Sequence, residues 1–380
     1  MWYNDLRPDS ELFNDRYALI MLDKENNYTR MLTDADKKRT LANLLELRKG
    51  LLAKIPRKTV DTNLLMCSWN IKNFGTLKKR TAESLYYIAE IINAFDIVAL
   101  QEINRELGDF KKVLKLLGSH WKHTFTDVTE GSAGNDERFG FIYDSRRISQ
   151  SGLSGEIVIS PESSEESSII RQLKRTPIVT GFESGWRKFS IVSVHLHPGK
   201  GHTNKAIRRE EVRLLTEILQ KKIHSAALED RNMIIVGDTN LYKDDDDIVQ
   251  FITDAGFKES SGLVGKFTNT SLSQIYDRIF FNVDYYFKIS VDEQEKEKGD
   301  VFNLFDYVYV DTPEDIAVYH DLMLQHKDDP DTLTDDAKFR SYFNSYWKRN
   351  QMSDHLPIWV EVQTESSDEF LSAKFNKIRL

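Results

Sequence analysis

Short apolar runs in this sequence are repeatedly followed by a carboxylate, a carboxamide or an imidazole. The clearest case is Met233–Asn240, where four apolar residues and a glycine precede Asp238, and Asn240 follows two places later. Side chains two residues apart in extended chain point the same way, so Asp238 and Asn240 would face a common site. Asp238 could orient or deprotonate a water molecule, and Asn240 could donate to an oxygen that gains charge. Gly-Asp-x-Asn also forms ordinary turns, so this fragment alone leaves both interpretations open.

Seven further polar residues stand at or beside the ends of predicted strands. They are Asn70, Glu102, Glu137, His195, Asp277, Asp354 and His355. Buried strands of α/β proteins deliver such residues to one rim of the sheets, where sites form. Each has a structural alternative: Asn70 could cap a turn, and Glu102 could begin a loop. Asp277 could pair with Arg278, and Asp354 could be a helix N-cap. Nine such residues beside short apolar runs are hard to explain as caps alone.

The segments that must position these residues predict an α/β layered domain. Strand-like apolar runs lie at 64–71, 96–100, 139–143, 177–182, 189–194, 233–240, 276–281 and 352–362. Amphipathic helical patterns lie between several of them, at 81–94, 110–117 and 203–223. Alternating strands and helices are typical of sheets covered by helices.

The remaining segments flank or interrupt this domain. A helical pattern over 34–55 ends at Pro56, so we predict that residues 1–60 form an N-terminal helical extension of a catalytic domain spanning 61–380. Residues 301–310 are aromatic and strand-like, and 312–350 predict an insertion with two helices. Structural cover is the simplest role for the extension. A protein partner or self-association through 1–60 or 312–350 is the alternative.

Composition limits the class of protein. Of 380 residues, 40% are hydrophobic and 29% charged, as in ordinary globular proteins. The net charge of −8 argues against electrostatic binding of nucleic acid by the whole surface. A local basic groove, or binding bridged by divalent cations, remains compatible with it. The single cysteine, Cys67, excludes a disulfide framework and indicates a reducing compartment. With no apolar run near ~20 residues and no signal peptide, we expect a cytoplasmic protein without membrane contact.

Seven segments resemble, in order, the motifs of the endonuclease/exonuclease/phosphatase superfamily. They are WNI, LQEI, a Glu before a Phe-rich strand, VSVHLHP, GDTN, YDRI and SDHLP, and they extend from about Leu64 to Val362. The resemblance implies a four-layer sandwich of two packed mixed β-sheets flanked by helices. It also implies hydrolysis of phosphate esters with a divalent metal. WNIKNFG, the Glu137–His195 pair, Arg175-Thr176-Pro177 and YDRI are most similar to the pancreatic-type deoxyribonuclease branch.

The resemblance implies a metal site. Glu102 would be the principal ligand, and Asn70 and Asp354 would complete or flank the site. Carboxylate and amide oxygens suit Mg²⁺ or Mn²⁺. The four-acid run Asp244–Asp247 could bind a structural Ca²⁺, but we favour a solvated loop there.

The resemblance also implies a catalytic set. Its members would be Glu137, His195, Asp238, Asn240, Asp277 and His355. In the pairs Glu137–His195 and Asp277–His355, a carboxylate behind the imidazole fixes its tautomer and raises its pKa, which prepares the ring to donate to phosphate oxygens. Arg175 would contact a phosphate, and Arg105 is a second candidate for substrate contact.

These residues predict a divalent-metal-dependent nuclease that hydrolyses DNA, or alternatively RNA, and cuts within the strand. A phosphomonoesterase or a phospholipid or inositol phosphodiesterase on the same fold is the alternative. A lipid enzyme would be expected to carry exposed apolar loops near the rim, and the sequence shows no convincing example. A binding module without activity is disfavoured because every expected polar position is filled.

Overall fold

Two mixed β-sheets form the centre of this computed structural model, which describes residues 1–11, 32–75, 80–129, 136–159, 170, 172–224 and 231–378. The strands are β1 (Asn63–Phe74), β2 (Ile97–Asn104), β3 (Trp121–Phe125), β4 (Glu137–Asp144), β5 (Ser149–Glu156), β6 (Ile178–Ser184), β7 (Arg187–His195), β8 (Met233–Asp238), β9 (Lys258–Glu259), β10 (Asp277–Asn282), β11 (Lys288–Ile289), β12 (Gly299–Val301) and β13 (Ile358–Gln363). One sheet has the order β11-β13-β1-β2-β4-β3, with β12 also on β13, and the other has the order β5-β6-β7-β8-β10-β9. The pairs β1–β2 and β7–β8 are parallel, and the other strand pairs are antiparallel.

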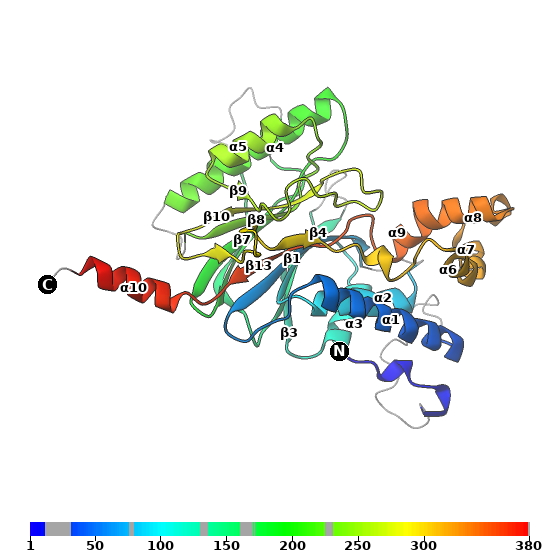
Figure 1. Ribbon diagram of the computed structural model, residues 1–380. Helices are drawn as coiled ribbons and strands as arrows, with labels where there is room; N and C mark the ends of the chain where they lie inside the picture. Colours follow the sequence, from blue (N-terminus) through cyan, green and yellow to red (C-terminus); the bar gives the residue numbers. More distant parts are fainter. Residues whose placement is uncertain are drawn as a thin grey trace.

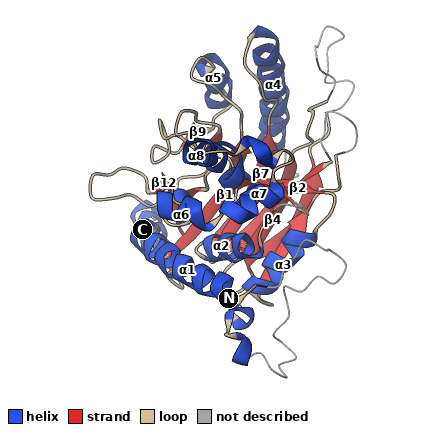
Figure 2. Ribbon diagram, turned by 90° about the vertical axis from the view of Figure 1, so that its right-hand side faces the viewer, coloured by secondary structure: helices blue, strands red, loops and turns tan. Residues whose placement is uncertain are grey.

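The helices of the described residues lie around the two sheets. They are α1 (Asp34–Lys54), α2 (Ala82–Asn93), α3 (Gly108–Leu117), α4 (His202–His224), α5 (Asp246–Asp254), α6 (Pro313–Val318), α7 (His320–His326), α8 (Asp336–Tyr342), α9 (Lys348–Gln351) and α10 (Ser367–Lys377). In Figure 1 and Figure 2, α4 and α5 lie on one side of the sheets, and α1, α2 and α3 lie on the other. The predicted four-layer α/β sandwich is therefore confirmed.

Alternation along β1 shows why its sequence forms a central strand. Leu64 and Met66 join the apolar core between the two sheets. Leu65 and Cys67 point the other way, into the core beneath α1, α2 and α3. Because successive side chains of a strand face opposite sides, a strand buried on both faces is apolar at nearly every position.

The first helix is built into the same core as the central strand. Its residues Leu44, Leu47 and Leu51 pack in the cluster that contains α2 and the outward side of β1. A capping box formed by Thr33 and Asp36 begins the helix. Residues 12–31 of the predicted extension lie outside the described residues, and the division at residue 60 stays a prediction.

Two predicted elements were wrong. Residues 301–310 are mostly not a strand: β12 ends at Val301, and a single 3-10 turn spans Leu304–Asp306. Their aromatic residues instead pack on the helices, where the Tyr309 hydroxyl lies 2.7 Å from Ser84 Oγ of α2. Residues 312–350 contain α6, α7, α8 and most of α9 rather than two helices, because Thr312 and Asp335 each cap a new helix.

The four-acid run also differs from the prediction. Its last two residues begin α5, and Asp245 is buried and accepts hydrogen bonds from Arg208 at 2.9 and 3.2 Å. Asp247 pairs with Lys205 at 2.7 Å. The protein's own cations thus occupy these carboxylates, which leaves the Ca²⁺ hypothesis unsupported. In the part of the chain that the structure describes, every helix is too short or too polar to cross a bilayer.

Candidate active site

The predicted polar residues meet at one end of the layer between the two sheets. Asn70 lies on the same side of β1 as the inter-sheet residues Leu64 and Met66, since all three positions are even-numbered. His195 ends β7 and is paired in register with Asp238, which ends β8. Asp238 is in turn opposite Asp277, the first residue of β10. Strand alternation and register therefore gather side chains from distant parts of the chain.

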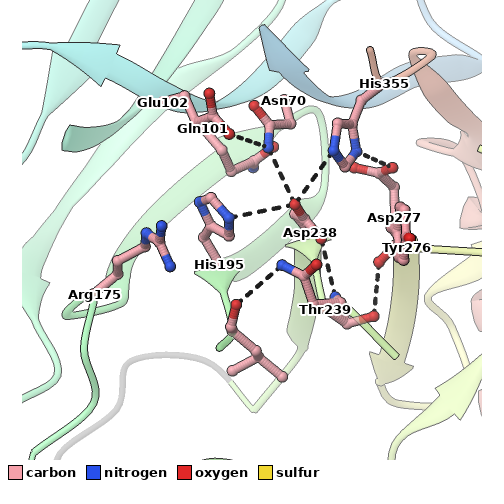
Figure 3. Close-up of polar contacts among 12 residues, drawn as sticks. Asn70, Gln101, Glu102, Arg175, His195, Asp238, Thr239, Tyr276, Asp277 and His355 are labelled. Atoms are coloured by element: carbon pink, nitrogen blue, oxygen red, sulfur yellow. Dashed lines mark hydrogen bonds and ion pairs between the residues drawn. The ribbon is translucent and has the colours of Figure 1, made fainter. Parts of the chain in front are cut away.

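Asp238 is the centre of this group (Figure 3). Its Oδ2 accepts a hydrogen bond from Asn70 Nδ2 at 3.1 Å. The same oxygen lies 3.4 Å from His195 Nε2 and 3.6 Å from His355 Nε2. Its Oδ1 accepts from the backbone N–H of Asn240 at 2.9 Å. Asp238 is only 2% exposed, so these contacts operate in a largely water-free environment that strengthens them.

A second carboxylate stands behind each imidazole. His355 Nδ1 lies 2.8 Å from Asp277 Oδ2, and His195 Nδ1 lies 3.3 Å from Glu137 Oε2. Burial disfavours the charged form of His355, but the charges of Asp277 and Asp238 outweigh burial and raise its pKa well above the usual value. The pKa of His195 is raised in the same way, with burial opposed by Asp238 and Glu137. Both shifts extend the protonated form of the rings to higher pH, and both rings present Nε2 to Asp238.

Arg175 joins the group through Glu137. Its Nε donates to Glu137 Oε2 at 2.7 Å, and both side chains are buried. Burial raises the pKa of Glu137, but contacts with His195 and Arg175 outweigh burial and lower it. Arg105 lies apart from the buried group: its side chain is 54% exposed and pairs with Asp136 at 2.9 Å.

Glu102 and Asn70 provide oxygens that fit a hard divalent cation. Glu102 has a positive φ of 59° at a register shift in β2, which turns its side chain toward Asn70. Asn70 Nδ2 donates to Glu102 Oε1 at 3.0 Å, whereas Asn70 Oδ1 is buried and has no hydrogen-bond partner among the residues that the structure describes. Within the described residues, ligand atoms of Glu102, Glu137 and His195 also lie within 4.8 Å of one another. The orphaned amide oxygen beside a carboxylate suits Mg²⁺ or Mn²⁺.

Two predicted residues lie at the edge of this arrangement. Asp354 immediately precedes His355, and its backbone carbonyl accepts from Thr270 N at 3.0 Å. Its carboxylate is one of the charges that raise the pKa of the neighbouring His355. Asn240 Nδ2 donates to Leu196 O at 3.0 Å, so this side chain also holds the loop that follows β7.

The sequence profile of the Endonuclease/Exonuclease/phosphatase family matches residues 67–350. The chain belongs to this family. Its members are hydrolases that act on phosphoester bonds. A comparison with curated protein sequences finds no match.

Solved structures with a similar chain path include three that share little sequence with this chain. The human Nocturnin catalytic domain with bound sulfate anion is 14% identical, with 79% of this chain and 94% of that chain covered and a TM-score of 0.48. Truncated Caenorhabditis elegans TDP2 is 16% identical, with 79% and 98% covered and a TM-score of 0.48. The endonuclease/exonuclease/phosphatase from Bacteroides vulgatus is 14% identical, with 81% and 100% covered and a TM-score of 0.49.

Sequence reasoning missed several residues that support the site in this family member. Ser353 Oγ donates to Asn70 O at 2.7 Å, and Trp69 Nε1 donates to His355 O at 3.0 Å. Gln101 Nε2 donates to Ser193 Oγ at 2.9 Å and so joins the two sheets just below the site. The motifs WNI, LQEI, VSVHLHP and SDHLP contain all of these residues. Their place inside those motifs is the signal that could have found them.

Proposed function

We propose that the chain is a divalent-metal-dependent nuclease that hydrolyses DNA phosphodiester bonds and cuts within the strand. The observation that carries this proposal is the pair of imidazoles, His195 and His355, that present Nε2 to the shared carboxylate of Asp238. Glu102 and the orphaned oxygen of Asn70 lie beside them. The link of Arg175 to Glu137 and His195 supports the pancreatic-type deoxyribonuclease branch, and the buried lone cysteine supports a reducing compartment such as the cytoplasm.

Phosphodiester hydrolysis requires an attacking water, relief of charge on the phosphoryl oxygens and a proton for the leaving oxygen. Asp238 would accept a hydrogen bond from the water and orient it. Its Oδ2 lies near Nε2 of both His195 and His355, the ring nitrogens that Glu137 and Asp277 do not contact. His195 and His355, held through Nδ1, would donate from Nε2 to phosphate oxygens. A cation held by Glu102 and Asn70, with Asp354 nearby, would supply Lewis-acid stabilisation of the phosphoryl charge.

Two further groups would hold the substrate phosphate. The Arg175 guanidinium donates through Nε to Glu137 and points toward His195 in Figure 3. It would therefore place a fixed positive charge at the site. The Asn240 amide uses one N–H on Leu196 O, and its second N–H would donate to a phosphate oxygen. Arg105 would contact a phosphate farther out, because it lies on the exposed rim.

Nicking of supercoiled plasmid with Mg²⁺ or Mn²⁺ tests the proposal. We expect the wild-type protein to convert the plasmid to the nicked form, and EDTA to prevent this. Asp238→Ala should reduce the rate by about 10²–10⁴-fold, the usual contribution of a general acid–base group. Asp368→Ala is the matched control, since this exposed carboxylate lies on α10 and β13 separates it from His355.

Substrate panels separate this function from its alternative. Intact plasmid with both metals would exclude the nuclease activity. Hydrolysis of phosphomonoesters or phosphoinositides, without cleavage of DNA, would favour the phosphatase or lipid phosphodiesterase alternative. A parallel reaction with an RNA strand of the same sequence distinguishes the two nucleic acids.

A further inference from the structure

A basic cavity of about 550 Å³ opens beside the candidate active site. It lies between the loop that leads into α4, the first turns of that helix, and the loop that joins β8 to α5. Lys200, Lys205, Arg208, Tyr242 and Lys243 contribute to its lining. Cavities of 300–1,000 Å³ accommodate small ligands or parts of larger ones, so this cavity has room for one unit of a polymeric substrate.

Aromatic contacts connect the cavity to the catalytic group. Tyr242, a lining residue, lies two places after Asn240. Its ring meets the ring of Tyr276 edge-on, with 5.4 Å between the centroids. Tyr276 in turn lies 5.7 Å from the imidazole of His355. The cavity is therefore two ring contacts away from one of the proposed proton donors.

Two of the lining cations are already neutralised within the protein. Arg208 is buried, and its Nε and Nη2 both donate to Asp245 Oδ2. Its guanidinium also lies 4.8 Å from the centroid of the Tyr242 ring, which fixes that ring in place. Lys205 pairs with Asp247 at 2.7 Å. Arg208 and Lys205 thus have structural roles within the protein, and no ligand is needed to explain them.

Lys200 and Lys243 are different. Both are exposed, and in the part of the chain that the structure describes neither pairs with a carboxylate. Lys200 Nζ lies 5.8 Å from the centroid of Tyr242, and Lys243 Nζ lies 5.3 Å from that of Phe267. Aromatic rings thus position both ammonium groups while leaving their N–H donors for an anion. Two acidic residues also line the cavity. Asp245 is paired with Arg208, and Asp244 is exposed, so Lys200 and Lys243 face one further carboxylate.

We propose that Lys200 and Lys243 form a subsite for a second phosphate of the substrate, the one next to the phosphate being cleaved. This inference rests on the proposed nuclease function and extends it: the preferred substrate is a phosphodiester chain that continues past the scissile bond, not an isolated phosphodiester. A chain with a net charge of −8 needs such a local cluster of cations to hold a polyanion.

The test compares two substrates that differ in the neighbouring phosphate. Bis(p-nitrophenyl) phosphate has only the scissile phosphate, whereas a single-stranded oligonucleotide has several. For the Lys200→Gln/Lys243→Gln variant, we expect kcat/KM on the oligonucleotide to fall by roughly tenfold or more and its dependence on log salt to flatten by about 0.7 per lost contact. Turnover of bis(p-nitrophenyl) phosphate should not change.

A neutral methylphosphonate in place of the adjacent phosphate sharpens the test. It should slow the wild-type protein about as much as the double substitution does, and it should have little further effect on the variant, because both changes remove one interaction. Lys374→Gln/Lys377→Gln on α10 is the matched control. It removes the same charge on a helix that follows β13, whereas His355 precedes that strand, and Figure 1 shows α10 extending away from the sheets.

Each other outcome has a distinct meaning. Equal oligonucleotide rates in wild type and variant would overturn the subsite while the nuclease function stands. Equal loss on both substrates, with an unchanged unfolding midpoint, would also overturn it, since the lysines would then act on the reacting phosphate itself. If the wild-type protein cleaves neither substrate, the proposed function fails, and the subsite fails with it.

Discussion

The ion pair between Arg39 of α1 and Glu83 of α2 shows how firmly the first helix is tied to the catalytic fold. Arg39 Nε lies 2.9 Å from Glu83 Oε2, and the side chains are 19% and 0% exposed, respectively. Tyr309 Oη, from the segment after β12, donates to Glu83 Oε1 at 3.4 Å. Burial raises the pKa of Glu83, and Arg39 opposes that rise.

Replacing Arg39 by Met keeps most of the side-chain volume and leaves the buried carboxylate of Glu83 without its cation. Removing one partner of a buried ion pair costs about 3–5 kcal/mol. Since Arg39 is partly exposed, we expect the lower end, a loss of about 3 kcal/mol in the free energy of unfolding at pH 7.5. Arg39→Met/Glu83→Gln should recover most of that loss, because it removes the buried charge of Glu83, and Asp36, the other partner of Arg39, keeps its hydrogen bonds from Thr33.

The deficit should depend on pH with a definite sign. Burial already raises the pKa of Glu83 in the folded wild type, and loss of Arg39 raises it further, because only the hydrogen bonds from Tyr309 and Tyr319 then oppose burial. Between these two folded pKa values, the folded variant binds a proton that the folded wild type does not. The deficit is therefore complete above the folded pKa of the variant and shrinks as the pH falls toward the folded pKa of the wild type.

Urea unfolding followed by tryptophan fluorescence would measure the difference between wild type and each variant at pH 7.5 and pH 5. Glu83→Gln alone serves as the control for loss of the carboxylate. An Arg39→Met protein as stable as the wild type at pH 7.5 would refute the reasoning. So would a deficit that the second substitution does not relieve. Either result would favour 61–380 as a domain that folds without the first helix.

Three further predictions concern the site itself. Mg²⁺ should raise the Tm of the wild-type protein but not that of Glu102→Gln, because a ligand that binds only the folded state stabilises it; calorimetry with and without the ion measures this. Asp277→Asn should lower kcat by about 10²–10⁴-fold because His355 loses the carboxylate 2.8 Å from its Nδ1, as read from initial rates at saturating substrate. Gly237→Ala should lower the free energy of unfolding by at least about 2 kcal/mol, measured in urea, because φ is +129° and a Cβ would lie 2.2 Å from Val194 O.

Matched variants make these results interpretable. A rise in Tm with Mg²⁺ that persists in Glu102→Gln would place the ion elsewhere. Asp254→Asn, on α5, controls for loss of a carboxylate, and an unchanged kcat in Asp277→Asn would contradict the orienting role. Gly155→Ala controls for the added methyl group, since nothing lies within 4 Å of its Cβ position. Equal stability of the Gly237 and Gly155 variants would contradict the steric argument.

Local pattern predicted the architecture well where it was strongly periodic. The predicted strand at 64–71 lies within β1, and the predicted helix at 81–94 corresponds to α2. The aromatic run 301–310 misled because aromatic residues favour strands and buried helix contacts alike. One of its side chains, Tyr309, contacts Ser84 of α2. A local sequence pattern does not indicate a contact between segments so far apart in the chain.

The family resemblance predicted the pairs Glu137–His195 and Asp277–His355, which the structure brings together, but other polar residues have partners that were not predicted. The Asp244–Asp247 run was expected to form a solvated loop, yet Arg208 of α4 binds Asp245 and buries it. Asp354 matches the family pattern, whereas Arg105 lies one place later than the arginine of that pattern, and its exposed position keeps it outside the buried group. The lysine pair beside Tyr242 was not recognised, because Lys200 and Lys243 are far apart in the chain.

The order of the motifs and the alternation of apolar residues are properties of the chain itself. For that reason, the sequence alone determined the family, the layered fold and the residue types available for phosphoester chemistry. The resemblance also named the carboxylate behind each imidazole, but the place of Asp238 as the carboxylate shared by both rings depended on the register of β7, β8 and β10. Hydrogen bonds and charge interactions depend on separations of a few ångströms, and only the folded chain sets those distances.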